Sequence, residues 1–266
     1  DPSKQSKIMT FRRFSILCGI VAIFLIFLDL MIIDIPFVLF PVLAVIYIGI
    51  SFGMAFKIES GFFMKAVCRG NPDRKEIILS FDDGPDPITT PVILDILKRN
   101  GVPATFFCIG KKIPGHEALL KRIIQEGHII GNHSYSHAVN FDFFSSDRIR
   151  KELKETGKII KEATGKSTLI FRPPYGVINP LLKKAIDGSG LTVVGYSNRV
   201  YDTSVKKPGK ILSRFQKNLK PGDIVLLHDT IPATASMLQK IIDHTKASGY
   251  RIVPIHESAN ISIYEE

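Results

Sequence analysis

Two long apolar runs near the start of the chain limit its possible folds more than any other feature. Phe14–Ile33 contains 20 residues with one charge, Asp29, and Ile35–Phe56 contains 22 residues with none. A helix rises about 1.5 Å per residue, so either run could cross the roughly 30 Å hydrocarbon core of a bilayer. Segment 34–36, which contains a proline, supplies a short turn between them. The sequence therefore predicts an N-terminal membrane anchor, residues 1–56, folded as a two-helix transmembrane hairpin.

Two alternatives remain open for this region. A single long tilted helix would cross the membrane once, and a signal peptide would be removed from the mature protein. The apolar length exceeds that of an ordinary signal sequence, and no small-residue cleavage pattern follows the first run. Asp29 is expected near the hairpin turn in the interface, although a charge inside a span can also mark a functional site.

Basic residues flank both ends of the apolar region, whereas the turn carries only Asp34. They are Lys4, Lys7, Arg12 and Arg13 before the first run, and Lys57, Lys65, Arg69, Arg74 and Lys75 after the second. Under the positive-inside rule a hairpin keeps both ends, and the rest of the chain, on the cytoplasmic side of a bacterial inner membrane. A single span would place the rest of the chain outside.

The formal net charge of +10 also bears on the partners of the chain. A basic protein beside a membrane is attracted to anionic headgroups, so we expect membrane lipids among its partners. Nucleic acid is the competing partner, but the chain has no basic stripe interleaved with aromatic residues. We therefore expect no binding of nucleic acid.

From Glu76 onward, short apolar strands alternate with amphipathic helical stretches. The expected strands are 77–81, 104–108, 129–132, 169–171, 191–196, 223–227 and 251–253, and the expected helices are 91–99, 116–126, 146–163, 179–188, 208–219 and 233–247. This alternation is typical of an α/β fold with a parallel sheet, open or closed into a barrel. We divide the chain into the anchor 1–56, a linker 57–75 and a catalytic domain 76–266.

The stretch SFDDGPDP, residues 80–87, places two adjacent carboxylates, Asp82 and Asp83, at the end of the first expected strand. Adjacent like charges repel each other, and the burial of either one without a partner is costly. Active sites of parallel α/β folds lie at the carboxyl ends of the strands, where polar residues from several strands meet. We therefore expect a positive group beside this pair.

A pair of histidines follows the third expected strand. His133 and His137 are four residues apart, which on a helical turn places both imidazoles on one face. The spacing alone is a weak signal, but with one carboxylate it supplies the usual protein ligands of a catalytic zinc-type site. Either Asp82 or Asp83 would then bind the metal, and the other would be free to act as a general base on the attacking water.

Two further residues at strand ends suit the chemistry of hydrolysis. Arg172 could hold the base through a charge-assisted hydrogen bond, although an arginine paired on the surface is the alternative. His228 stands where a general acid could protonate a leaving group, with Asp202 or Asp229 raising its pKa. Four other histidines have no evident partners, and we expect them to be solvated: His116, His128, His244 and His256.

Four segments, SFDDGP, HSYSH, RPPYG and LLHD, follow one another along the chain. Together they resemble the successive motifs of the polysaccharide deacetylase family, also called the NodB homology domain or carbohydrate esterase family 4. The resemblance covers roughly residues 76–255. It implies a distorted (β/α)7-type barrel that hydrolyses N-acyl groups from amino sugars with a divalent metal ion, most commonly Zn2+, with Co2+, Ni2+ or Mn2+ as alternatives.

The resemblance also assigns roles that the residues alone leave open. Asp82 matches the catalytic base, and Arg172 matches the residue that orients this base. The metal ligands that match are Asp83, His133 and His137. His228 matches the catalytic acid, and the backbone N–H of Tyr175 matches the oxyanion-stabilising donor. The substrate-binding residues that match are Leu226, Pro173 and Tyr175, and Leu226 would line the pocket for the acyl methyl group.

The chain departs from the family pattern in segment 195–203. Family members often carry tryptophans and a second aspartate there, whereas this chain has no tryptophan and has Asn198 in the place of that aspartate. Asp202 is therefore the expected partner of His228. Tyr196 or Tyr201 could present a flat apolar face to a sugar ring, or either could belong to the core.

These observations predict a membrane-anchored carbohydrate N-deacetylase whose partner is an N-acylated amino sugar. The charge slightly favours a lipid-linked sugar, deacetylated or deformylated at the membrane surface, whereas an outward-facing domain would favour peptidoglycan or another N-acetylglucosamine polymer. A glycan-binding module without catalysis is a rival interpretation, but binding alone needs neither a base nor an acid. A metal phosphohydrolase is a further rival, because the same ligands and basic surface suit phosphate.

Overall fold

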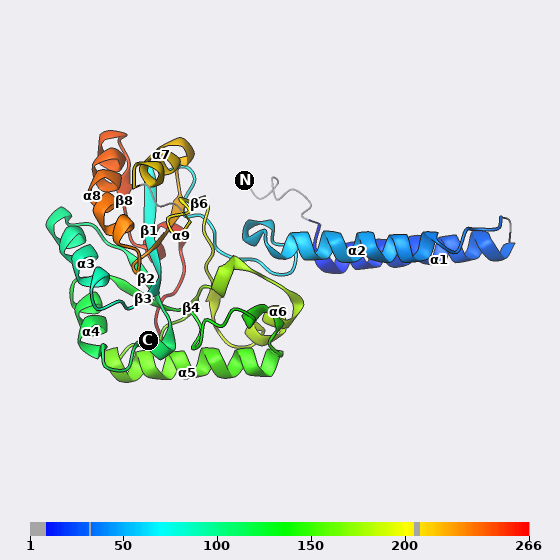
Figure 1. Cartoon of the computed structure of the whole chain (residues 1–266), viewed down its shortest axis with the longest axis horizontal. Coiled ribbons are helices and arrows are strands. Elements are labelled where there is room, and N and C mark those ends of the chain that lie inside the picture. The colour runs from blue at the N-terminus through cyan, green and yellow to red at the C-terminus, as the bar shows by residue number, and fades with distance from the viewer. Residues whose placement is uncertain (1–8, 32, 205–207, 266) are drawn as a thin grey trace.

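A curled parallel sheet forms the centre of the chain from Glu76 onward (Figure 1). The computed structural model describes residues 9–31, 33–204 and 208–265. The strands run in the order β5-β4-β3-β2-β1-β7-β6, and β8 pairs in parallel with the start of β1. They are β1 (Glu76–Gly84), β2 (Thr105–Cys108), β3 (Ile129–Asn132), β4 (Ile170–Phe171), β5 (Thr192–Val193), β6 (Asn198–Arg199), β7 (Asp223–His228) and β8 (Arg251–Ile252). This arrangement confirms the expected α/β fold of the distorted barrel type.

Helices cover the outside of the sheet, as Figure 1 shows for α3, α4, α5 and α8. The helix α5 illustrates why they form, since it buries one apolar stripe that includes Ile149, Leu153 and Ile160. The side chain of Ser145 caps its start, and Gly165 ends it in the left-handed region at φ 72°. The helices after β1 are α3 (Thr89–Asn100), α4 (Glu117–Gln125), α5 (Ser146–Thr164), α6 (Pro180–Ile186), α7 (Pro208–Asn218), α8 (Pro232–Ala247) and α9 (Ile255–Ala259).

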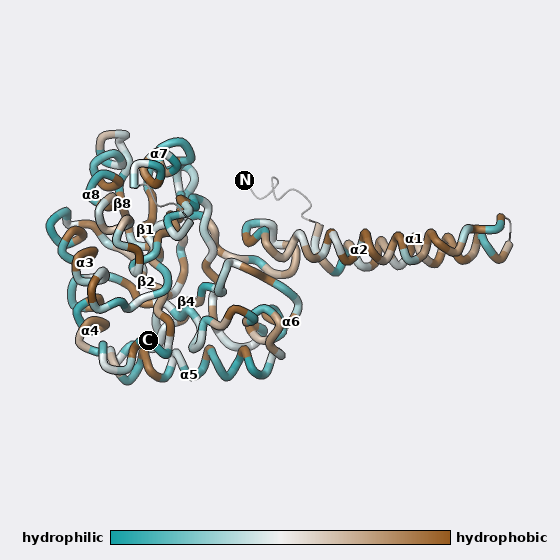
Figure 2. Tube along the Cα trace, in the orientation of Figure 1, coloured by the Kyte–Doolittle hydropathy of each residue, from teal (hydrophilic) through white to brown (hydrophobic). Residues whose placement is uncertain are grey.

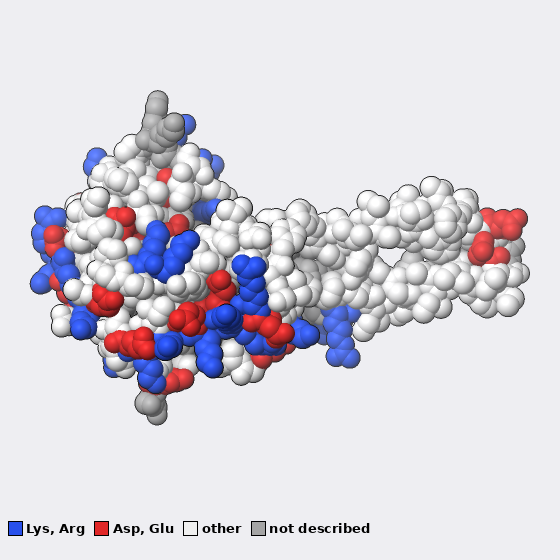
Figure 3. Space-filling model, turned by 60° about the horizontal axis from the view of Figure 1, so that its bottom comes forward, with Lys and Arg blue, Asp and Glu red and all other residues white. Residues whose placement is uncertain are grey.

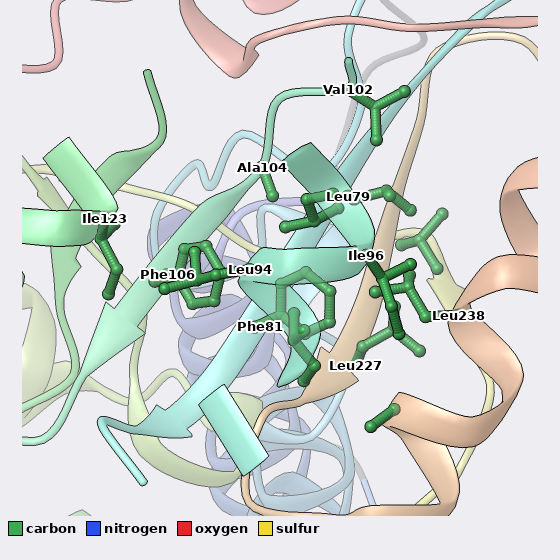
Figure 4. Close-up of a cluster of buried hydrophobic side chains, with 14 of the residues drawn as sticks. Leu79, Phe81, Leu94, Ile96, Val102, Ala104, Phe106, Ile123, Leu227 and Leu238 are labelled. Carbon is green, nitrogen blue, oxygen red and sulfur yellow. The ribbon is translucent and has the colours of Figure 1, made fainter. Parts of the chain in front are cut away.

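Alternate residues of β1 face two environments, because successive side chains of a strand point to opposite sides. Leu79 and Phe81 pack in the main core together with Phe106 and Leu227 (Figure 4). The rings of Phe81 and Phe106 stack with their centroids 5.0 Å apart. Asp82 therefore points away from this core, toward the inside of the curled sheet.

The sequence does not predict two of these elements, β6 and α9. The strand β6 has only two residues, which is too short for a periodic pattern. Its position depends on pairing with a neighbour, since Asn198 of β6 pairs with Val225 of β7. Tertiary contacts rather than local sequence therefore define this edge of the sheet.

The segment between the apolar region and β1, residues 57–75, packs against the sheet. Phe62 and Phe63 are buried. The N–H of Val67 donates to the carbonyl of Val193 at 2.8 Å, and the N–H of Gly195 donates to the carbonyl of Val67 at 2.9 Å. This segment thus lies beside the end of β5, and the division of the chain at residues 56 and 75 stays a prediction.

The apolar region forms α1 (Phe11–Met31) and α2 (Leu39–Ala55), which lie side by side and project away from the sheet as a rod (Figure 1). The helix α1 has 21 residues, an apolar window of mean hydropathy 2.6 and no burial of that window, so its length and composition suit a membrane span. Figure 2 shows mostly hydrophobic residues along the rod, and Figure 3 shows acidic side chains at its far tip.

The second apolar helix is shorter than the sequence predicts. The helix α2 has 17 residues, because Pro36 lies in the turn and accepts a hydrogen bond at its carbonyl from the N–H of Leu39 at 2.9 Å. Within the described residues, α1 alone is both long and apolar enough to be a candidate span. The expectation of two full spans is thus met clearly by one helix only.

Asp29 lies at the turn of the rod, where its Oδ1 accepts a hydrogen bond from the backbone N–H of Ile35 at 2.8 Å. This position agrees with the expected place near the turn, and the location in a membrane interface stays a prediction. Two of the basic residues in the charge argument, Lys4 and Lys7, lie outside the described residues.

Candidate active site

The end of β1 brings two adjacent carboxylates into one cavity. In a regular strand the side chains of Asp82 and Asp83 would point to opposite faces. The pairing of β1 with β2 shifts between Asp82 and Gly84, and Asp83 adopts a left-handed conformation at φ 75°. A bulge of this kind redirects one side chain, so both carboxylates reach the same site.

Asp83, His133 and His137 converge as a candidate metal site. The Oδ1 atom of Asp83 lies 3.5 Å from Nε2 of His133 and 3.3 Å from Nε2 of His137. One ligand atom from each residue lies within 4.8 Å of the others. The same Oδ1 is buried and has no hydrogen-bond partner among the described residues, a state that a bound cation would relieve. The donor set therefore fits a zinc-type ion.

The two histidines lie close together, but not on the helical turn that their spacing predicts. Residues 133–137 form a loop rather than a helical turn, and Ser134 and His137 adopt positive φ angles of 62° and 46°. The Nδ1 atom of His133 lies 2.8 Å from the carbonyl of Arg172. A proton on Nδ1 donates to this carbonyl, which leaves Nε2 free to bind a metal.

Glu152 of α5 holds this loop, and the sequence gives no signal for it. Its Oε2 atom accepts hydrogen bonds from the backbone N–H groups of Tyr135 at 3.1 Å and Ser136 at 2.7 Å. The hydroxyl of Ser136 donates to the same atom at 2.9 Å. A glutamate on an amphipathic helix reads as an ordinary surface residue, so only the fold reveals this contact.

The pKa shifts of two candidate ligands, Asp83 and His137, favour a bound cation. Burial and the neighbouring His133 lower the pKa of His137 to about 4. Burial alone would raise the pKa of Asp83, but the two imidazoles outweigh it and hold that pKa below its usual value. An ionised carboxylate and a neutral imidazole are the forms that bind metal ions.

Arg172 is fully buried and holds Asp82. Its Nη1 atom lies 2.7 Å from Oδ1 of Asp82 and donates to the hydroxyl of Ser80 at 2.9 Å. Its Nη2 atom donates to the carbonyl of Gly195 at 2.8 Å, and its guanidinium lies 4.1 Å from the ring centroid of Phe107. The alternative of an arginine paired on the surface is therefore wrong, since no part of Arg172 is exposed.

His228 pairs with Asp202 at the end of β7. Nδ1 of His228 lies 2.7 Å from Oδ1 of Asp202, whose Oδ2 accepts from the backbone N–H of His228 at 2.8 Å. Burial alone would lower the pKa of His228, but Asp202 outweighs burial and raises it. The other candidates lie elsewhere, since Asn198 bonds to Asp223 and Asp229 accepts from Thr90.

One cavity of about 230 Å³ is lined by Asp82, Asp83, His133, His137 and His228. Leu226 and Tyr175 also line it, whereas Arg172, Asp202 and Pro173 are buried and do not. Tyr175 adopts a left-handed conformation at φ 59°, and its ring lies 4.8 Å from that of His137. The structure therefore places most of the predicted site residues on the cavity wall, and Arg172 and Asp202 contact two of them, Asp82 and His228.

Of the four histidines expected to be solvated, one is buried. His128 is 4% exposed, and its Nδ1 accepts a hydrogen bond from the N–H of Ala104 at 3.2 Å. Burial lowers its pKa to about 4. The expectation was wrong because the histidine lies where the end of a helix packs beside a strand, which its sequence neighbours do not reveal.

The fold and the site together define a class of protein, the α/β barrel-type hydrolases with a carboxylate and two histidines as candidate metal ligands. A family model described as polysaccharide deacetylase matches residues 69–194. A peptidoglycan-N-acetylglucosamine deacetylase of Bacillus cereus is 38% identical over 192 residues, which cover 70% of this chain and 89% of that relative. The chain belongs to the polysaccharide deacetylase family, also called carbohydrate esterase family 4, whose enzymes hydrolyse N-acetyl groups of amino sugars.

Other relatives and solved structures extend this comparison. A peptidoglycan-N-acetylmuramic acid deacetylase of Bacillus subtilis, PdaC, is 31% identical, and the match covers 74% of this chain but only 41% of that relative. The structure of Bc1960, a peptidoglycan N-acetylglucosamine deacetylase, has a TM-score of 0.69 at 32% identity and covers 74% of this chain and 94% of that one. The structure of BA3943 of Bacillus anthracis, described as a pseudoenzyme of the family, has a TM-score of 0.68 at 31% identity. The match covers 73% of this chain and 68% of the BA3943 chain.

Proposed function

We propose that this chain is a membrane-anchored, metal-dependent deacetylase that removes N-acetyl groups from the amino sugars of peptidoglycan. The proposal rests on one observation, the convergence of the Asp83, His133 and His137 side chains with Asp82 and His228 in a single cavity, where the buried Arg172 holds Asp82. Because the family includes a pseudoenzyme, the fold alone does not establish activity, and these side chains carry the argument. The named substrates of the relatives supply the sugar class.

Asp83, His133 and His137 would hold the metal ion. A divalent ion bound there would lower the pKa of water and polarise the acyl carbonyl. We favour Zn2+, because two imidazoles and one carboxylate are a usual catalytic zinc set, and Co2+, Ni2+ or Mn2+ suit the same donors.

Asp82 would act as the general base that takes a proton from the attacking water. Its bond to the buried guanidinium of Arg172 fixes the orientation of the carboxylate. His228, with its pKa raised by Asp202, would remain protonated and donate that proton to the departing amine nitrogen. Arg172 and Asp202 would thus act by positioning the base and the acid.

Tyr175 and Leu226 of the cavity, together with the adjacent Pro173, would position the substrate. The backbone N–H of Tyr175 would donate to the oxyanion that forms from the acyl carbonyl. Leu226, which is almost fully buried, would pack against the acyl methyl group. Pro173 would contribute to substrate binding indirectly, because it fixes the start of the turn 174–176 that carries Tyr175.

Residues 1–56 would anchor the enzyme in a bacterial cytoplasmic membrane, and residues 76–266 would form the catalytic domain. The apolar exposure of α1 supports this, as does an apolar cavity of about 460 Å³ where α2 meets the catalytic region. Membrane lipids would then be partners of the rod.

A reporter fused after residue 266, combined with protease access in intact cells, would locate the catalytic domain. A soluble full-length protein would contradict the anchor.

A lipid-linked amino sugar is the second candidate substrate. A hollow beside the end of α2, lined in part by Phe56 and Lys57, favours it. This hollow shares lining residues with the active-site cavity. A catalytic domain on the cytoplasmic side would exclude mature peptidoglycan and favour this candidate. An outer location would support peptidoglycan.

Released acetate tests the proposed reaction. The full-length protein in detergent, loaded with Zn2+, should release acetate from N-acetylated peptidoglycan fragments and should release no phosphate from phosphate esters. Phosphate release without acetate would favour a phosphohydrolase. Binding of the glycan without either product would favour a glycan-binding module.

A further inference from the structure

A second hollow adjoins the active-site cavity and shares part of its wall. This hollow, of about 430 Å³, is lined by residues 56–60, which directly follow α2, and by residues of segment 196–201. The side chains of Tyr196 and Arg199 line both spaces. A sugar bound in the cavity would therefore place any substituent directed toward the rod next to Arg199.

Arg199 belongs to a cluster of arginine and tyrosine side chains that contact one another. Its guanidinium lies 4.8 Å from the ring centroid of Tyr201, and the guanidinium of Arg214 lies 5.2 Å from the same ring. Tyr201 is 47% exposed and adopts a left-handed conformation at φ 57°, which is costly for a residue with a side chain. Backbone strain of this kind often marks a functional segment.

The positive charge of Arg199 is not matched by an acid. Its side chain donates a long hydrogen bond of 3.5 Å to the hydroxyl of Tyr196, and no carboxylate lies within 4.0 Å of it among the described residues. Lys57 lines the same hollow. Glu59 is the acid of this wall, and burial raises its pKa, which weakens its competition for the arginine. A guanidinium in this state suits an oxyanion with two acceptor atoms.

We propose that Arg199 forms an anion-binding subsite beside the catalytic cavity, which takes a phosphate or a carboxylate carried by the N-acylated amino sugar. The inference rests on the proposed function and deepens it by naming the substrate class. A phosphate would come from a lipid-linked sugar, whereas a carboxylate would come from a muramic-acid-type sugar. The segment that lacks the tryptophans of the family would thus recognise charge instead of presenting a stacking surface alone.

Kinetics with three substrates test the subsite. Acetate release is measured with the Zn2+-loaded full-length protein on a neutral N-acetylglucosamine oligomer, on N-acetylglucosamine 1-phosphate and on an N-acetylmuramic acid disaccharide. The wild-type enzyme should have a higher kcat/KM for one of the two charged substrates than for the neutral oligomer. Whether that substrate carries a phosphate or a carboxylate shows which anion the subsite binds. Arg199→Gln should reduce kcat/KM for that substrate by about 10- to 100-fold more than for the neutral oligomer, since a hydrogen bond to a charged group is lost.

Two variants control for general effects. Arg199→Lys keeps the charge and should restore part of the preference, whereas Arg99→Gln, an exposed position of α3, removes the same charge and should leave the preference unchanged. An equal loss on charged and neutral substrates in Arg199→Gln, or no preference in the wild type, would overturn the subsite.

Binding without turnover separates this inference from the proposed function. If no substrate yields acetate, titration calorimetry with N-acetylglucosamine 1-phosphate and with the muramic acid disaccharide still tests the subsite. Tighter binding of one of them to the wild type than to Arg199→Gln would support it. Equal binding of both ligands by the two proteins would refute it.

Discussion

The rod formed by α1 and α2 and the region from Glu76 onward place their apolar side chains in opposite ways. Ile23 and Leu30 of the rod are 69% and 73% exposed, whereas Leu79 and Phe81 of β1 are fully buried. Apolar exposure on this scale is unfavourable in water and favourable in hydrocarbon. The exposed apolar side chains of the rod therefore support the proposed membrane anchor, whereas the catalytic region buries its own.

Their acidic side chains differ in a related way. Asp29 lies at the turn of the rod, where a backbone N–H satisfies it. Asp83 lies in a cavity beside two imidazoles, with one buried oxygen that has no hydrogen-bond partner within the described part of the chain. A carboxylate that looks out of place in the sequence can thus be a simple cap or part of a reactive centre, and its neighbours decide which.

The largest expected effect separates these two carboxylates. Asp83→Ala should abolish both metal uptake and acetate release, because it removes one of three candidate ligands. Asp29→Asn should leave both unchanged, since it lies at the far end of the rod from the cavity. Metal analysis together with acetate release checks this, and full activity of the Asp83 variant would show that the chemistry is located elsewhere.

Asp82→Asn should reduce kcat by about 10²- to 10⁴-fold while the protein still binds metal, because only the general base is lost. The amide keeps the size of the side chain but removes the charge that pairs with the buried Arg172, so the thermal unfolding midpoint should fall. Stopped-time acetate assays and metal content measure the two properties separately. Normal turnover in this variant would refute the assignment of Asp82 as the base.

A pair of truncations tests the contrast in packing directly. Phe106→Ala, at a position that is 1% exposed, should lower the free energy of unfolding of the catalytic region by about 3 to 5 kcal/mol through loss of packing. Ile23→Ala, in the rod, should not affect the stability of that region. Denaturant titration in detergent monitors both variants, and equal losses would mean that the rod and the sheet unfold as one unit.

The smallest expected effect concerns pH. Asp202 raises the pKa of His228, so the acid stays protonated and activity should fall only as pH rises through that raised value. Asp202→Asn removes the main stabiliser of the protonated form, so the decline should begin at a lower pH, with a loss of roughly tenfold at neutral pH. A pH profile of kcat/KM checks the direction, and an unshifted alkaline limb would contradict this role.

The sequence predicts much of this molecule because its strongest signals are local. Apolar run length predicts the rod, and alternating periodicity predicts the central strands and long helices, since both follow from how side chains repeat along a helix or strand. The paired aspartates, the two histidines, Arg172 and His228 were identified from their places after strands. The chemistry of these residues, combined with the motif resemblance, was enough to propose their roles.

The tertiary structure decided the features that depend on distant parts of the chain. A bulge, rather than regular strand geometry, turns Asp83 into the cavity beside Asp82, and a loop held by Glu152 presents His137. The hollow that Arg199 lines together with residues 56–60, which follow α2, joins segments that no local pattern relates. Local sequence specifies which elements form, but the packing of those elements determines which side chains meet.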